Sequence, residues 1–170
     1  CGMTAAPFYN WRSDSFGDGA RRSFEEMIKI RSLVDPFSEI PVRMGSACQM
    51  PDIRTAVSSP AADFIIETAR MMTDEPLYLL GIGAPTNIAS ALVKAPDIID
   101  KVVVVWLGGN EVKLESNAGE FNMDQDFNAT RVLFESDVAL VQYPANCVTS
   151  TLWINENTMR EELTAGENPL

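Results

Sequence analysis

The sequence predicts an α/β protein with an open, mostly parallel sheet that carries helices on both faces. Short apolar segments typical of strands alternate with longer segments of helical periodicity along the whole chain. Residues 102–105 are consecutive valines, and such continuous apolar strands are typical of parallel sheets buried on both faces. Residues 77–106 have the pattern of a strand, turn, helix and strand, which is a βαβ unit. The 170 residues are 46% hydrophobic, so we expect one core and a single domain over residues 1–170.

The first part of the chain is expected to form a strand, a helix and a second strand. Residues 2–8 are small and apolar, like the end of a buried strand, and a polar loop follows them. We expect Asp18 to cap the helix after this loop, because its carboxylate can accept hydrogen bonds from free amides of the first turn. The helix runs to Val34 and ends before Pro36, since the residue before a proline disfavours helical geometry. Residues 40–44 form the next strand candidate.

The middle of the chain gives the clearest helix signal. Ser59 is a favourable cap and Pro60 fits the first helical position, and an apolar stripe follows them. Residues 77–80 are then expected to form a buried strand, which a glycine-rich turn connects to a helix over residues 85–94. A second buried strand over residues 101–106 completes the βαβ unit.

The last part of the chain continues the alternation. A long polar loop over residues 107–124 is followed by an expected helix at 127–136, a strand at 138–142 and a helix near 158–163. The chain begins without methionine, and residues 166–170 form a turn-like stretch. We therefore expect an incomplete domain that is truncated at both ends.

Composition excludes several classes of function. With 24 acidic and 13 basic residues the formal net charge is −11, which disfavours nucleic acid and anionic membranes as partners. No apolar run approaches the roughly 18 residues of a membrane span. The chain has no histidine, which excludes histidine-dependent triads and histidine-ligated zinc within it. Its three cysteines lack paired spacing, so we expect free thiols and a cytoplasmic location.

Ligands of open α/β sheets bind at the carboxyl ends of the strands, so the turns after the predicted strands are candidate site segments. Asn10 follows the first strand, and Asn110 lies in the turn after residues 101–106. The turn at residues 81–87 could bring backbone groups close to a ligand, because glycine tolerates tight conformations. It matches neither the phosphate-binding loop nor the dinucleotide pattern. An ordinary strand-to-helix turn is the alternative reading of this segment.

A second candidate segment lies in the long polar loop. Asn117, Glu120 and Asn122 provide donors and acceptors of the kind that vicinal sugar hydroxyls require. An ordinary polar turn is again the alternative. Asp124 and Asp126 add carboxylates close by, and acids at the start of a helix are more often capping groups than catalysts.

The motifs of these segments resemble a known family. Ile82-Gly83-Ala84-Pro85-Thr86-Asn87-Ile88-Ala89, Pro96, Val103-Val104-Val105-Trp106-Leu107-Gly108-Gly109, Glu120-Phe121-Asn122 and Asp126 occur in this order. Together they resemble the central part of the inosine-uridine preferring nucleoside hydrolases. The resemblance is close over residues 76–135 and looser over residues 4–70. It implies a nucleoside hydrolase-like α/β fold and a small-molecule nucleoside or ribose-like substrate.

The resemblance also implies roles for individual residues. Members of the family cleave the N-glycosidic bond of ribonucleosides with a calcium ion that holds the ribose and activates a water. Their Glu-Phe-Asn motif grips the ribose, and an asparagine shortly before it assists. The backbone carbonyl of Ile82 corresponds to a calcium ligand. The implied substrate-binding residues are Asn10, Leu107, Asn110, Asn117, Glu120 and Asn122, with Asn110 and Asn117 as alternatives for the assisting asparagine.

Other parts of the family pattern fall outside this sequence or differ from it. The aspartate cluster with most calcium ligands and the general base would lie upstream of Cys1, and a further aspartate ligand and a histidine would lie beyond Leu170. We therefore expect this chain alone to bind Ca²⁺ weakly or not at all and to be inactive, because calcium takes six to eight oxygens. Phe127 replaces the family's usual proline, which indicates a divergent branch.

We expect the parent protein to be an N-ribosyl hydrolase of purine or pyrimidine salvage and a homo-oligomer. A non-catalytic ribose-binding or nucleoside-binding module on the same fold is the main alternative. A third possibility is another doubly wound protein, such as a nucleotide-binding one, that shares only the fold.

Overall fold

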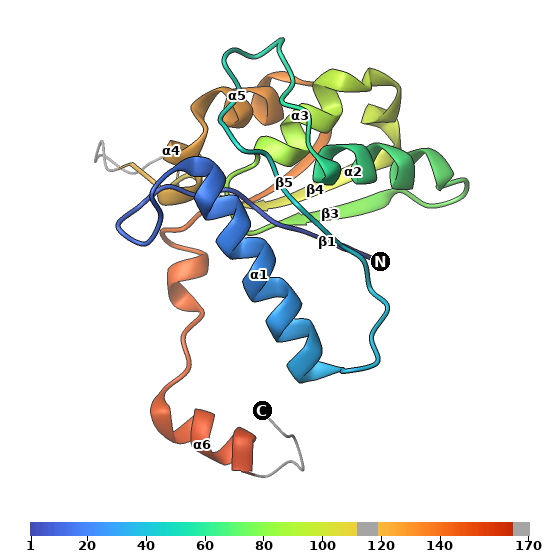
Figure 1. Cartoon of the computed structure of the whole chain (residues 1–170). Coiled ribbons are helices and arrows are strands. Elements are labelled where there is room, and N and C mark those ends of the chain that lie inside the picture. Colours follow the sequence, from blue (N-terminus) through green and yellow to red (C-terminus); the bar gives the residue numbers. More distant parts are fainter. Residues whose placement is uncertain (112–118, 165–170) are drawn as a thin grey trace.

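The structure, a computed structural model, describes residues 1–111 and 119–164 and alternates strands with helices (Figure 1). The elements, in chain order, are β1 (Met3–Thr4), α1 (Phe16–Val34), β2 (Val42–Arg43), α2 (Pro60–Met71), β3 (Leu77–Gly81), α3 (Thr86–Lys94), the 3₁₀ helix η1 (Pro96–Lys101), β4 (Val102–Leu107), α4 (Phe121–Gln125), α5 (Phe127–Glu135), β5 (Ala139–Tyr143), the 3₁₀ helix η2 (Thr149–Thr151) and α6 (Glu156–Thr164).

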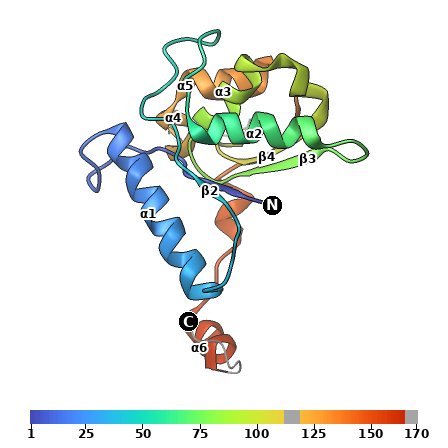
Figure 2. The same ribbon diagram turned by 45° about the vertical axis from the view of Figure 1, so that its right-hand side comes forward.

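All described strand pairs are parallel. β1 pairs with β2, and β4 lies between β3 and β5, with Gly81 opposite Trp106 and Leu107 opposite Tyr143. The α2, α3 and α5 helices lie on one side of the strands, and α1 lies on the other side (Figures 1 and 2). The predicted α/β fold with parallel sheets and flanking helices is confirmed. The described strands form two sheets, whereas the sequence suggested a single continuous one.

The main core lies between one face of the β3–β4–β5 sheet and the helices α2, α3 and α5. Val102, Val104 and Trp106 alternate along β4 and are buried in this core. The opposite face is exposed in the part of the chain that the structure describes: Leu80 of β3 is 74% exposed, and Tyr143 of β5 is also exposed. The valine run therefore predicted a strand correctly, but among the described residues helices cover just one face of this sheet.

Helix α1 begins before the predicted capping residue. Its cap is Ser15, whose Oγ accepts a hydrogen bond from the amide of Asp18 at 3.1 Å. Asp18 lies in the first turn, where hydrogen bonds from Arg22 and Arg21 hold the pKa of its carboxyl well below its usual range. The prediction that Asp18 caps the helix was wrong, because both residue types suit a helix start and the hydroxyl lies one turn earlier.

Ser15→Ala is expected to lower the free energy of unfolding of the full-length protein by about 1 kcal/mol, because the amide of Asp18 loses its acceptor. Urea denaturation at neutral pH measures this change. The serine cap does not titrate, so its effect should persist in acid. The stabilising effect of the arginine pairs should instead decrease as the pH falls below about 4, because the Asp18 carboxyl then takes up a proton in the unfolded chain before it does so in the folded protein. An unchanged unfolding midpoint for Ser15→Ala would contradict this assignment of the cap.

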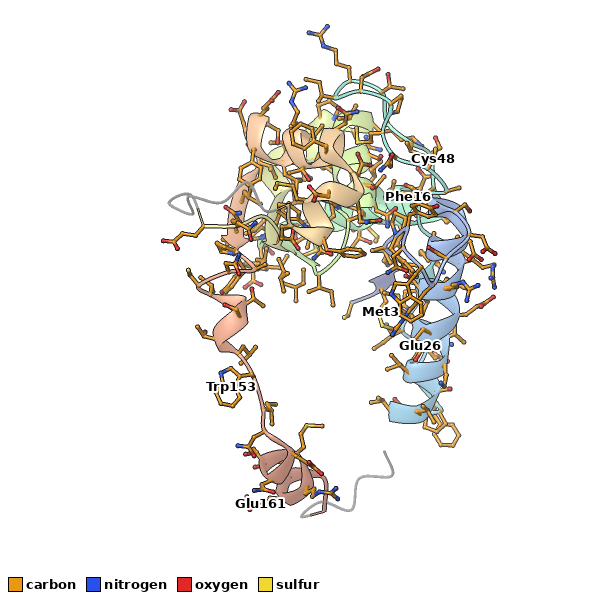
Figure 3. All side chains as sticks on the ribbon, turned by 90° about the vertical axis from the view of Figure 1, so that its left-hand side faces the viewer. Met3, Phe16, Glu26, Cys48, Trp153 and Glu161 are labelled. Carbon is orange, nitrogen blue, oxygen red and sulfur yellow. The ribbon has the colours of Figure 1, made fainter. Side chains whose placement is uncertain are left out.

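Three smaller differences from the sequence prediction occur. The polar loop after β4 contains the short helix α4, and η1 precedes β4. Helix α6 begins two residues before the predicted position and stands apart from the body of the molecule, with Trp153 on the segment that leads to it (Figure 3). The three cysteines are free, as the sequence predicted, and the structure shows that all of them are exposed. No helix within the described ranges is long and apolar enough to cross a membrane.

Candidate functional site

The carboxyl ends of β1, β2 and β3 meet at the side chain of Asn87. This residue is buried near the start of α3, and its Nδ2 donates to the carbonyl of Ala5 after β1 at 2.7 Å. Its Oδ1 accepts from the amide of Ser46 after β2 at 2.9 Å. One amide group therefore connects the β1–β2 sheet to the turn that follows β3, and it fixes the two sheets relative to each other at the candidate edge.

Asn87→Asp is expected to lower the free energy of unfolding by about 2 kcal/mol, because a carboxylate oxygen would face the Ala5 carbonyl in place of a donor. Urea denaturation of the full-length protein tests this expectation. Asn155→Asp is the matched control, since Asn155 is exposed and its Oδ1 accepts from the amide of Thr158, a role that a carboxylate can also fill. Equal stabilities for the two variants would show that the contact with Ala5 does not hold the sheets together.

The glycine-rich turn after β3 lies against both neighbouring segments of this edge. Ile82 is 82% exposed, and a Cβ placed on Gly83 would lie only 2.8 Å from that of Ala6. The indole Nε1 of Trp106 donates to the carbonyl of Gly83 at 3.0 Å. The turn is thus held from two sides, and it places the predicted metal-ligating residue Ile82 at the carboxyl edge.

Glu120 connects the turn after β4 to the start of α4. Its Oε2 accepts hydrogen bonds from the amides of Gly109 at 2.7 Å and Met123 at 3.0 Å, and its Oε1 accepts from the amide of Asn122 at 3.0 Å. The residue is only 7% exposed. Three amides bond this carboxylate, and no donor among residues 1–111 and 119–164 fills the second acceptor position on Oε1. This position could accept one hydroxyl group.

Asn122 points to the same turn. Its Nδ2 donates to the carbonyl of Leu107 at 2.9 Å, and the residue is 8% exposed. Glu120, Asn122 and Leu107, which the sequence assigned to one binding site, therefore come together where β4 ends. In this arrangement the two motif side chains bind the protein backbone, which orients them at the edge of the sheet.

The other predicted site residues do not share this arrangement with Glu120 and Asn122. The Oδ1 of Asn10 accepts from the amide of Arg12 at 2.8 Å and so stabilises its own turn. This turn is next to α4, because Gln125 accepts a hydrogen bond from the amide of Tyr9 at 2.5 Å. Asn110 accepts from Asn146 at 3.0 Å, on the side toward β5. Asn117 lies outside the described residues.

Two candidate residues, Asp126 and Thr86, were not assigned to the site from the sequence. Asp126 is 1% exposed, and its carboxylate accepts from the amides of Met50 at 2.9 Å and Ala129 at 3.0 Å and from the hydroxyl of Thr86 at 2.8 Å. The bond to Ala129 confirms the capping role that the sequence suggested. The other two bonds join segments far apart in the chain, and no local pattern predicts them.

The described residues do not by themselves provide a calcium site. In these residues no group of three or more acidic, cysteine or histidine side chains is placed to hold a metal ion. The Glu120 carboxylate accepts from backbone amides, and that of Asp126 accepts from amides and from the Thr86 hydroxyl. The family resemblance assigns the carbonyl of Ile82 as a ligand. Calcium requires several more oxygens.

A cavity of about 460 Å³ lies at the opposite, amino edge of the β3–β4–β5 sheet. Pro76, Val102 and Ala139 are among its lining residues. None of the predicted site residues lines it, and open α/β sheets bind ligands at the other edge. The cavity is therefore separate from the candidate site.

Comparison with known proteins identifies relatives of this chain. The inosine-uridine preferring nucleoside hydrolase family matches residues 19–169. An uncharacterized protein of Schizosaccharomyces pombe is 36% identical over 97 residues, which are 55% of this chain and 31% of that protein. The pyrimidine-specific ribonucleoside hydrolase RihB of Escherichia coli is 31% identical over 118 residues, which are 68% of this chain and 37% of RihB.

A solved structure agrees with these sequence matches. The crystal structure of an inosine-uridine preferring nucleoside hydrolase from Bacillus anthracis superposes with a TM-score of 0.52 at 26% identity, over 64% of this chain and 38% of that one. The chain spans less than half the length of these relatives. The family match over most of the chain confirms the resemblance seen in the motifs: the chain belongs to the inosine-uridine preferring nucleoside hydrolase family.

Proposed function

We propose that the protein hydrolyses the N-glycosidic bond of ribonucleosides and that this chain contributes the ribose-binding part of the active site. One observation carries the proposal: Glu120 and Asn122 converge on the turn that ends β4, at the edge where sheets of this class bind ligands. A buried carboxylate beside an amide suits a pair of sugar hydroxyls, which need an acceptor and a donor.

The reaction adds water to the anomeric carbon of the ribose while the bond from that carbon to the base nitrogen breaks. The base leaves with a proton, and the sugar passes through a state with oxocarbenium character. Glu120 would place negative charge near this state, and both side chains would hold the hydroxyls in position. Contacts that strengthen as the positive charge develops accelerate the reaction.

The metal remains part of the proposal for the complete enzyme. A bound calcium ion would orient ribose hydroxyls and a water molecule, and the carbonyl of Ile82 is the proposed contribution of this chain. The further ligands and the general base would come from elsewhere in the protein, so we propose that this chain alone is inactive. A cytoplasmic, homo-oligomeric salvage enzyme with one domain of this fold is the proposed context.

Ribose release tests the proposed activity. The full-length protein is incubated with inosine and with uridine, before and after chelation of divalent cations, and reducing sugar is measured. We expect release that chelation abolishes and calcium restores. Calorimetry with ribose, inosine and a mononucleotide covers the alternatives. Binding of ribose or nucleoside without turnover would favour the non-catalytic binding module, and mononucleotide binding that ignores calcium would favour a nucleotide-binding protein.

The relatives suggest which substrates to compare first. The Escherichia coli relative is named as pyrimidine-specific, and the Bacillus anthracis relative as inosine-uridine preferring. We propose a ribonucleoside as substrate, and the ratio of kcat/KM for uridine and inosine measures the preference of this protein.

A further inference from the structure

We propose that Asp126 and Thr86 form a positioning pair that holds helix α4, and with it Glu120 and Asn122, in the geometry required for sugar binding. The inference deepens the proposed ribonucleoside hydrolase function and rests on it. Neither residue is proposed to contact the substrate. Their role follows from the bonds that join the end of α4 to α3 and α5.

Helix α4 cannot be stable by its own hydrogen bonds. It has five residues, and isolated helices of that length do not form in water because nucleation is unfavourable. Glu120 caps its start through the amides of Asn122 and Met123. These are the same bonds that orient the carboxylate. The position of Glu120 therefore depends on α4 staying in place, as well as on the amide of Gly109.

Asp126 fixes that other end. Its backbone amide donates to the carbonyl of Met123 at 3.3 Å as the C-terminal cap of α4, and its carboxylate caps α5 through the amide of Ala129. The same carboxylate accepts from the hydroxyl of Thr86 on α3 and from the amide of Met50. One residue thus joins α4 to α5, to α3 and to the loop before α2.

The Asp126–Thr86 pair is buried, and the hydrogen bonds around it are interdependent. Thr86 is fully buried and Asp126 is 1% exposed, so water cannot readily replace a lost partner. Asn128 adds a further bond between α5 and the loop before α2, because its side chain donates to the carbonyl of Met50 at 2.9 Å. A buried acceptor that loses its donor incurs the full desolvation cost. Removing the Thr86 hydroxyl should therefore loosen the end of α4 without touching Glu120 or Asn122.

Amide hydrogen exchange in the full-length protein tests the positioning role directly. Thr86→Val keeps the volume of the side chain and removes the donor, whereas Thr86→Ser keeps the hydroxyl. Thr86→Val and Asp126→Asn are expected to speed exchange at the amides of Asn122 and Met123 by about tenfold relative to the strand amides of β4. Thr86→Ser should exchange like wild type. Asp137→Asn, an exposed acid at the amino edge, is the charge-matched control.

Steady-state kinetics test whether the positioning of α4 affects the reaction. At a temperature where circular dichroism shows every variant to be folded, Thr86→Val should lower kcat/KM for ribonucleosides about tenfold, because a displaced contact to the sugar lowers the rate steeply. Thr86→Ser and Asp137→Asn should keep the wild-type value. A purely structural role would change the unfolding midpoint and leave kcat/KM of the folded protein unchanged.

The possible outcomes separate the two proposals. Exchange at Asn122 and Met123 that is unchanged in Thr86→Val, or that rises equally in β4, would overturn the positioning role even in an active enzyme. Wild-type protein that releases no ribose from any nucleoside would overturn the proposed function. The exchange measurement would still show in that case whether Thr86 and Asp126 hold α4.

Discussion

Replacing Glu120 by alanine in the full-length protein is expected to lower kcat/KM for ribonucleoside hydrolysis by about 100-fold or more. The substitution removes a buried negative charge beside the proposed position of the sugar, where positive charge develops as the bond to the base breaks. It also leaves the amide of Gly109 without its acceptor. Ribose release at several substrate concentrations measures kcat and KM separately.

Two companion variants identify the cause of the loss. Glu120→Gln keeps the length of the side chain and one carbonyl acceptor but removes the charge. It should therefore reduce kcat strongly while α4 stays formed. Glu135→Ala removes an exposed glutamate from α5 that pairs with Arg131, and it should leave kcat/KM unchanged. If Glu120→Ala retained kcat/KM within about twofold of wild type, the assignment of Glu120 to the sugar would be wrong.

Trp106→Ala is expected to produce the largest loss of stability, about 4 kcal/mol in the free energy of unfolding. The side chain is fully buried, packs edge-on against Phe134 with ring centroids 6.2 Å apart, and donates to the carbonyl of Gly83. Alanine would leave a cavity in the core and an unpaired carbonyl in the turn after β3. Urea denaturation followed by circular dichroism measures the change.

Trp153→Ala is the matched control for this prediction. Trp153 is 76% exposed on the segment before α6, and its replacement should change the free energy of unfolding by less than about 0.5 kcal/mol. Trp106→Phe keeps most of the apolar volume and loses the indole donor. Its loss of unfolding free energy should therefore lie between those of Trp106→Ala and Trp153→Ala. Similar costs for Trp106→Ala and Trp153→Ala would show that β4 is not the centre of the core.

The sequence predicted most of the fold because its signals are local. Hydrophobic periodicity and the Ser59-Pro60 start located α2, and the valine run located β4. Periodicity could not determine that Ser15, and not Asp18, caps α1, because both residues suit a helix start. It also could not predict α4, whose five residues bond to Tyr9, Gln49 and Leu107, which are distant in sequence.

The sequence could predict the site residues that belong to a motif. It could not predict those whose role depends on tertiary contacts. Glu120 and Asn122 were assigned from their motif, and the structure places them together at the turn after β4. The bonds of Asp126 to Thr86 and Met50 span 40 and 76 positions along the chain. A single sequence contains no signal for such pairs, since each partner alone looks like an ordinary helix or loop residue.

The exposed face of the β3–β4–β5 sheet has a practical consequence for handling the isolated 170-residue chain. Tyr78 and Leu80 of β3 and Val141 and Tyr143 of β5 present apolar surface to water, and each Å² left uncovered forgoes about 25 cal/mol of transfer free energy. Such a patch adsorbs to hydrophobic resins and to aromatic fluorescent dyes. Mild detergent or a high concentration of arginine in the buffer should therefore improve its recovery during purification.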